Sequence, residues 1–281
     1  MGAALWMIGA VVSFSAMAVA GRAVFRELDV YQLMFYRSAI ALCLVLSFAA
    51  LSSGGLGQFR TRRIGLHILR NSSHLVGQFG WFFALALIPL AQLFALEFTT
   101  PLWVAVLAPL LLGERLTKWR VGAVALGFIG VLVVLRPGLQ DISLGSIVML
   151  VGAVGFAGSM LGTKRLAATE SPLTIIFYMA LIQTPVGLML AIHDLNWPSL
   201  ETGLWLVLVT ILGFTAHFCI VRAISLADAI VVAPMDFLRL PLIAVVGVVL
   251  YDEPLELWVF VGGALVLLAN YGNLMAERRK L

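Results

Sequence analysis

Ten apolar segments alternate with short polar turns along the whole chain. Each holds about 17–22 residues, and a helix rising 1.5 Å per residue needs about that number to cross roughly 30 Å of hydrocarbon. The segments lie at 3–20, 31–50, 72–89, 93–112, 119–135, 144–163, 172–192, 203–221, 228–250 and 257–275. This pattern predicts an all-α integral membrane protein with ten transmembrane helices.

The amino-acid composition also indicates that most of the chain lies in a lipid bilayer. Hydrophobic residues make up 62% of it and charged residues 11%, whereas a soluble domain carries roughly 25% charged residues. The first segment has no basic residue before it, so we interpret it as a retained helix rather than a signal peptide. Cys43 and Cys219 lie inside predicted spans and are not expected to pair.

The basic residues predict the orientation of the chain. With the N-terminus in the cytoplasm, 13 of the 18 Lys and Arg residues fall in cytoplasmic turns and 3 on the opposite side. The 13 are Arg60, Arg62, Arg63, Arg70, Arg115, Lys118, Arg120, Lys164, Arg165, Arg222, Arg278, Arg279 and Lys280. The positive-inside rule then places both termini in the cytoplasm of a multi-pass protein of the cell inner membrane.

The two halves of the chain echo each other. Phe35-Tyr36 recurs as Phe177-Tyr178, 142 residues on, and Glu114-x-Leu116-x-x-Trp119 recurs as Glu253-x-Leu255-x-x-Trp258 at a spacing of 139. We infer two five-helix units, at 1–138 and 142–277, followed by a basic tail at 278–281. Because five is odd, the second unit should cross the membrane upside down. Inverted repeats of this kind are an architecture of transporters.

Several of these residues also carry a family resemblance. Pro101-Leu102-Trp103, the run Leu110–Leu116, and Gly122, Gly127, Gly130 and Pro137 resemble the EamA domain of the drug/metabolite transporter superfamily; Pro241-Leu242, Asp252-Glu253 and Leu255 repeat the likeness. It covers the whole chain as two tandem EamA units. It implies export or import of small metabolites such as amino acids, vitamins, nucleobases or cationic drugs. In the second unit, Asp252 replaces the glycine found at Gly113.

Glu114 and Glu253 each stand just before a predicted span. A carboxylate there stabilises the positive end of a helix dipole by about 0.3–1 kcal/mol. We therefore interpret both glutamates as architectural rather than as ion-binding groups.

Ionisable groups inside spans are costly and mark functional candidates. Spans four and nine, equivalent in the repeat, combine acids with prolines near mid-membrane, and we expect them to face each other across the solute pathway. The candidate pathway residues are Glu97, Thr100, Trp103, Asp236, Arg239, Trp81 and His217. The candidate hinges are Pro101, Pro234 and Pro241.

Structural alternatives stay open for each charge. Asp236 and Arg239 can neutralise each other, Arg37 can extend to the outer headgroups, and Glu97 can pair with Arg239. An unpaired Glu97 would instead exchange protons with solute or solvent.

No motif for an enzyme, a metal site, a cofactor or a nucleotide loop stands out, and Ser72-Ser73-His74 is interpreted as a helix N-cap.

The leading function is a secondary transporter that works by alternating access and exports neutral or aromatic amino acids. Import of a vitamin or nucleotide-like metabolite is the alternative, and a non-transporting scaffold or receptor is the rival class. The expected partners are a small solute and the lipid bilayer, with protons as an open question and no nucleic acid. The sequence does not fix the oligomeric state.

Overall fold

The computed structural model describes residues 2–51, 55–112, 118–139, 141–226 and 235–278. These residues form helices and connecting turns, with no β-strand among them. In chain order the helices are α1 (Gly2–Val24), α2 (Val30–Leu51), the short 3₁₀ helix η1 (Gly55–Phe59), α3 (Ile64–Leu87), α4 (Leu90–Glu97), α5 (Thr100–Leu112), α6 (Lys118–Leu135), α7 (Leu144–Leu166), α8 (Pro172–Ala191), α9 (Leu200–Leu226), α11 (Arg239–Tyr251) and α12 (Leu257–Arg278). The all-helical prediction is confirmed for this part of the chain.

Within the described ranges, six helical stretches are long and apolar enough to cross a membrane, by length and composition. They are Gly2–Val24, Val30–Leu51, Leu90–Leu111, Leu144–Leu166, Pro172–Ala191 and Leu200–Ile220. Shorter apolar helices occupy Val121–Leu135, Arg239–Tyr251 and Leu257–Gly272.

Local sequence explains where two of these helices begin. The Ser143 hydroxyl accepts a hydrogen bond from the Ser146 amide at the start of α7, and Ser171 does the same for Thr174 at the start of α8. Serine at this position satisfies an amide that has no partner within the helix. Pro172, which lacks an amide hydrogen, stands at the first position of α8, where none is needed.

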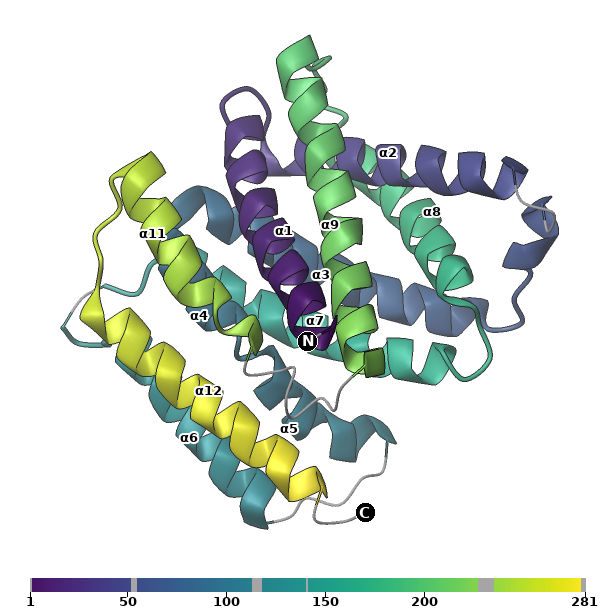
Figure 1. Ribbon diagram of the computed structural model, residues 1–281. Helices are drawn as coiled ribbons and strands as arrows, with labels where there is room; N and C mark the ends of the chain where they lie inside the picture. The colour runs from purple at the N-terminus through teal and green to yellow at the C-terminus, as the bar shows by residue number, and fades with distance from the viewer. Residues whose placement is uncertain (1, 52–54, 113–117, 140, 227–234, 279–281) are drawn as a thin grey trace.

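Helices from the first half of the chain pack against helices from the second. The main pairs are α1 with α9, α3 with α7, α6 with α12 and α2 with α8 (Figure 1). Small residues allow the closest approaches: a Cβ atom at Gly80 would lie 2.8 Å from the Gly152 Cα, and one at Gly130 would lie 2.7 Å from the Gly262 carbonyl oxygen. Glycine therefore lets these backbones touch.

The α3–α7 contact corrects the predicted start of the third span. The sequence places it at residue 72, whereas α3 begins at Ile64. A Cβ atom at Gly162 of α7 would lie 2.9 Å from the Arg70 Cβ atom. The two helices are therefore still in contact at residue 70, N-terminal to the predicted start. Ser72-Ser73-His74 accordingly lies inside α3, and its interpretation as an N-cap is wrong.

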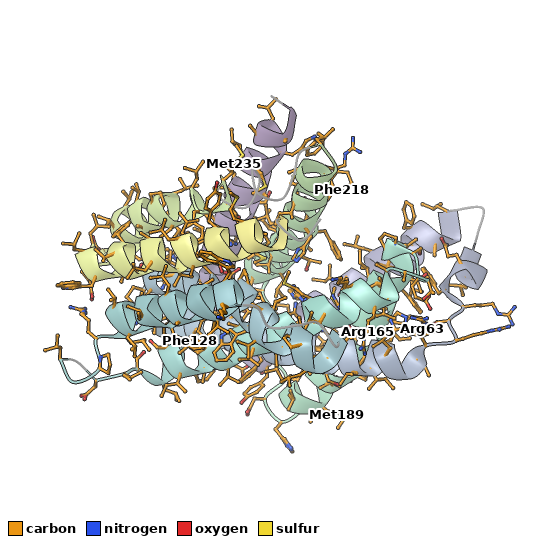
Figure 2. All side chains as sticks on the ribbon, turned by 90° about the horizontal axis from the view of Figure 1, so that it is seen from below. Arg63, Phe128, Arg165, Met189, Phe218 and Met235 are labelled. Carbon is orange, nitrogen blue, oxygen red and sulfur yellow. The ribbon has the colours of Figure 1, made fainter. Side chains whose placement is uncertain are left out.

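Residues expected on one side of the membrane meet at one end of this pair. Figure 2 shows Arg63, just before α3, beside Arg165 near the end of α7. The Arg63 guanidinium donates to the Arg165 carbonyl oxygen over 3.2 Å. Both arginines belong to the predicted cytoplasmic set, so the fold gathers them at the same end.

The structure also describes the two cysteines and Asp252. Cys43 on α2 is exposed and Cys219 on α9 is buried, and both are free thiols, as expected. Asp252 ends α11 in the left-handed region, with φ 53°, a conformation that aspartate tolerates better than most residues. The Gly113–Thr117 turn with Glu114, and Pro234, lie outside the described residues.

Candidate functional site

The fourth predicted span is interrupted between α4 and α5. Pro101 has no amide hydrogen, so it cannot bond the Glu97 carbonyl one turn earlier. The Thr100 hydroxyl donates to that carbonyl instead, over 2.8 Å, and Asn270 of α12 donates to the Phe98 carbonyl over 2.9 Å. Side chains thus satisfy the backbone that the interruption frees, as apolar surroundings require.

A second interruption lies before α11. Asp236 is helical, Phe237 and Leu238 form a turn, and α11 begins at Arg239 with Pro241 as its third residue. This turn follows the Phe98–Thr99 turn by 139 residues, the spacing of the sequence repeat. Pro101 and Pro241 therefore both stand at the start of the helix that follows an interruption.

Three charged side chains meet at the two interruptions. Arg239, only 3% exposed, places Nη2 3.1 Å from Asp236 Oδ2 and 3.4 Å from Glu97 Oε1. The other oxygen of Glu97 accepts a hydrogen bond from the Trp81 indole over 2.8 Å. Both pairings that the sequence left open, Asp236 with Arg239 and Glu97 with Arg239, are therefore present. One guanidinium between two carboxylates leaves a formal excess of one negative charge.

Aromatic rings enclose the Arg239 guanidinium. Its central carbon lies 4.6 Å from the ring centroid of Phe14, 4.8 Å from that of Phe94 and 4.9 Å from that of Phe98. Each ring offers a favourable cation–π contact, which is stronger where water is excluded. Sequence reasoning missed Phe14, which no motif marks. Phe98 does carry a sequence signal: it belongs to the aromatic residues gathered in the third and fourth predicted spans, and Phe237 occupies the equivalent repeat position.

The remaining candidates lie at different distances from this cluster. His217 Nδ1 contacts the Gly213 carbonyl of its own helix over 2.8 Å, and its ring meets the Phe14 ring edge-on at 5.4 Å, so it adjoins the cluster through Phe14. Trp103 packs edge-on against Phe128 of α6 at 5.0 Å. Its neighbourhood is therefore the α5–α6 pair.

Arg37 does not extend to the headgroups as the sequence suggested. Its guanidinium lies over the Phe82 ring at 5.7 Å, and a Cβ atom at Gly213 of α9 would stand 4.0 Å from Arg37 Nη1. The side chain is directed between helices. A cation–π contact with Phe82 stabilises it there.

Glu253 is part of a clamp on the α3–α4 junction. Its Oε2 accepts from the Leu90 amide at the start of α4 over 2.8 Å, and its Oε1 lies 2.5 Å from Arg22 Nη1. Arg22 also donates to the carbonyls of Leu85 and Ile88, over 3.1 and 2.8 Å. The expectation that Glu253 stabilises the helix following it is thus corrected: the helix start that it caps is that of α4. Arg22 belongs to α1 and Glu253 to the segment between α11 and α12, and we call the two residues the Arg22–Glu253 clamp.

This arrangement defines a class of protein. A multi-pass helical membrane protein with two interrupted helices, and charged side chains gathered at the interruptions, has the parts of a secondary transporter. In the described ranges no group of three or more His, Cys, Asp or Glu residues could hold a metal ion.

The chain belongs to the EamA-like transporter family, whose sequence profile matches residues 1–136 and 143–275. It is similar to a riboflavin transporter of Vibrio cholerae, with 32% identity over 95% of this chain and 90% of that one. It is also similar to an S-adenosylmethionine uptake transporter of Rickettsia felis, with 25% identity over 98% and 93% of the two chains. The Pseudomonas aeruginosa pseudopaline exporter CntI shares 25% identity over 92% and 90%. A solved crystal structure with 19% identity matches 98% of each chain with a TM-score of 0.66, which supports the fold.

Proposed function

We propose that this transporter takes up riboflavin, or a close flavin analogue, across the bacterial inner membrane, with both termini in the cytoplasm. The observation that carries the proposal is the cluster at the two helix interruptions, where Glu97, Asp236 and Arg239 stand beside the rings of Phe98 and Phe237. Aromatic faces with a few fixed polar groups suit a planar heterocycle. The stacked rings would open to admit the solute between them.

Relatives support this choice of solute. Riboflavin and S-adenosylmethionine, named for two relatives, both join a planar heterocycle to a hydroxyl-bearing sugar group, an open ribityl chain in the first and a ribose ring in the second. Amino acid export, the leading sequence-based hypothesis, has no support from these relatives. Import of a vitamin or nucleotide-like compound, the alternative, fits them. Uptake is the direction that we propose, and export is the outcome to be distinguished, since one relative is named an exporter.

Alternating access would follow from an inverted ten-helix repeat. Glu97 and Asp236 stand 139 residues apart, as do the two interruptions beside them. In the repeat, α7 is the equivalent of α1, and α9 is the equivalent of α3. The packed pair α1–α9 is therefore the repeat equivalent of the packed pair α7–α3. A bundle with this internal symmetry has two equivalent shapes, one open to each side.

We include protons as the coupling ion in this proposal. Riboflavin carries no net charge at neutral pH, so its binding would leave the excess negative charge of the cluster uncompensated in a medium of low polarity. A proton on Glu97 would compensate it. Glu97 is the natural acceptor because it lies farther from Arg239 than Asp236 does and shares its other oxygen with a neutral indole.

A growth assay tests the proposal. In a host that neither makes nor takes up riboflavin, expression of this chain should restore growth at micromolar riboflavin, whereas an Arg239→Met variant at equal membrane abundance should not. Secretion of flavin from a flavin-producing host would identify an exporter. Absence of both effects would contradict a flavin transporter and favour another solute or a scaffold.

A further inference from the structure

One face of α3 carries a strip of buried polar side chains. His67, Asn71, His74 and Gln78 recur at the three- and four-residue spacing that aligns side chains on one side of a helix. Their exposed fractions are 0, 0, 9 and 6%. Trp81 follows Gln78 on the same face and donates to Glu97, so the strip ends at the charged cluster. We call these four residues the α3 strip.

Several polar atoms of the strip have no partner among the described residues. Both ring nitrogens of His67, the amide nitrogen of Asn71 and the amide oxygen of Gln78 are buried and make no hydrogen bond. Buried polar groups nearly always have partners, because leaving them unpaired forfeits the hydrogen bonds that water would make. Unpaired donors and acceptors along one helix face therefore point to a polar occupant.

Helix packing does not explain the strip. The face of α3 that packs on α7 is the neighbouring one, where Gly77 and Gly80 meet the α7 backbone. The strip lies between this face and α8: Gln183 of α8 reaches His74 Nδ1 at 3.0 Å, and Tyr178 of α8 lies over the His67 ring at 4.3 Å between centroids. Of the strip, His74 also meets α7, where its ring lies edge-on to that of Phe156 at 5.8 Å. Both contacts leave the unpaired atoms of Asn71 and Gln78 free.

We propose that the α3 strip is the subsite for the hydroxyl-bearing chain of the solute, and that Asn71 and Gln78 select for that chain. The proposal rests on the function proposed above and extends it: the ring occupies the cluster of Phe98 and Arg239, and the chain extends from it along α3. Seven residues of helix separate Asn71 from Gln78, about 10 Å along the axis. Hydroxyl groups both donate and accept, so one chain can satisfy the Asn71 amide nitrogen and the Gln78 oxygen.

A proton path to Glu97 explains the strip less well. The step between Gln78 and Glu97 passes through the Trp81 indole, which donates a hydrogen bond but cannot accept one. A chain of proton transfers would stop there. A bound solute does not need an unbroken chain of proton donors and acceptors. It needs only hydrogen-bond partners along its length.

Uptake of riboflavin and lumiflavin by proteoliposomes tests the subsite. The two share the ring, but lumiflavin carries a methyl group in place of the hydroxylated chain. The wild-type protein should prefer riboflavin, and Gln78→Leu should lower its preference, measured as a ratio of kcat/KM values, by about five- to tenfold. Asn71→Leu, which removes the other unpaired group of the selecting pair, should lower the preference in the same direction. Lumiflavin uptake should stay within about twofold of wild type in both variants.

A matched control is Thr210→Val. Thr210 is also buried and polar, but its hydroxyl donates to the Leu206 carbonyl of its own helix, so the preference should not change. Thermal unfolding of Gln78→Leu in detergent should match wild type, because this substitution removes an unpaired buried atom. An unchanged preference in both strip variants, with wild-type uptake intact, would overturn the subsite alone. Failure of the wild-type protein to transport either flavin would overturn the proposed function, and the subsite with it.

Discussion

The rings of Phe98 and Phe237 stack with centroids 4.2 Å apart and planes 19° from parallel, although 139 residues separate them in the chain. Each belongs to the turn that interrupts a helix, and an acid precedes each: Glu97 and Asp236. Arg239 lies against the Phe98 ring and between the two acids. The duplicated unit thus brings its two equivalent positions into contact where the charges gather.

Replacing Glu97 by a neutral residue should separate the binding of the solute from its coupling to protons. In proteoliposomes, Glu97→Gln should abolish accumulation of riboflavin driven by a pH gradient while riboflavin counterflow stays within about threefold of wild type. The amide oxygen still accepts from Trp81, but the side chain no longer carries a proton across. Asp236→Asn should lower counterflow itself, by about tenfold, because Asp236 is the nearer partner of Arg239. Full gradient-driven uptake by Glu97→Gln would exclude it as the coupling residue.

Removal of the buried cation should cost stability as well as transport. Arg239→Met leaves two acids facing each other without a counter-charge, so the free energy of unfolding should fall by about 3–5 kcal/mol. Chemical denaturation in detergent measures this loss. The triple variant Arg239→Met, Glu97→Gln, Asp236→Asn should recover most of the stability but no transport. Recovery of transport in the triple variant would show that these charges serve folding alone.

The Arg22–Glu253 clamp should stabilise the α3–α4 junction. Arg22→Met removes the ion pair with Glu253 and two hydrogen bonds to backbone carbonyls of α3 and its C-cap, so the free energy of unfolding should fall by about 2 kcal/mol. Glu201→Gln is the control, since this exposed carboxylate accepts a long hydrogen bond, 3.5 Å, from Trp205 of its own helix. Equal stability of both variants would show that the clamp contributes nothing in the folded state.

Glu27 gives the fold a dependence on acid pH. Hydrogen bonds from Thr202 and Ser199, at the start of α9, hold the pKa of this exposed carboxyl below its ordinary value of 4.5. Because the folded pKa is depressed, the stabilisation is complete above pH 4.5 and is lost as the pH falls through the folded value. Thermal unfolding from pH 6 to pH 3 should show a smaller decline for Glu27→Gln than for wild type. Parallel curves would contradict this role.

Sequence patterns predicted the helices and the charged cluster more fully than the packing around them. The 139-residue spacing and the acids of spans four and nine pointed to Glu97, Asp236 and Arg239, because charges in apolar segments are rare. The sequence did not predict Phe14 as a site residue, since an aromatic residue in an apolar helix carries no distinguishing signal. It did not predict the α3 strip because His67 and Asn71 precede the apolar run. α3 begins at Ile64, before that run, and so includes them.

Orientation of the chain is a prediction that labelling can check. Single cysteines introduced after Met275 and in the Glu114 turn, in a background without Cys43 and Cys219, should both react only from the cytoplasmic side. A cysteine at Asp194, between α8 and α9, should react only from the opposite side. Labelling of the first two positions from different sides would contradict five spans per repeat.

Riboflavin counterflow tests most directly whether solute binds at the paired interruptions. Proteoliposomes preloaded with riboflavin should accumulate labelled riboflavin through the wild-type protein. The double variant Phe98→Ala, Phe237→Ala should lose at least tenfold, whereas Phe48→Ala, an exposed aromatic residue on α2, should match wild type. Counterflow in the double variant equal to wild type, or none in the wild-type protein, would contradict the account.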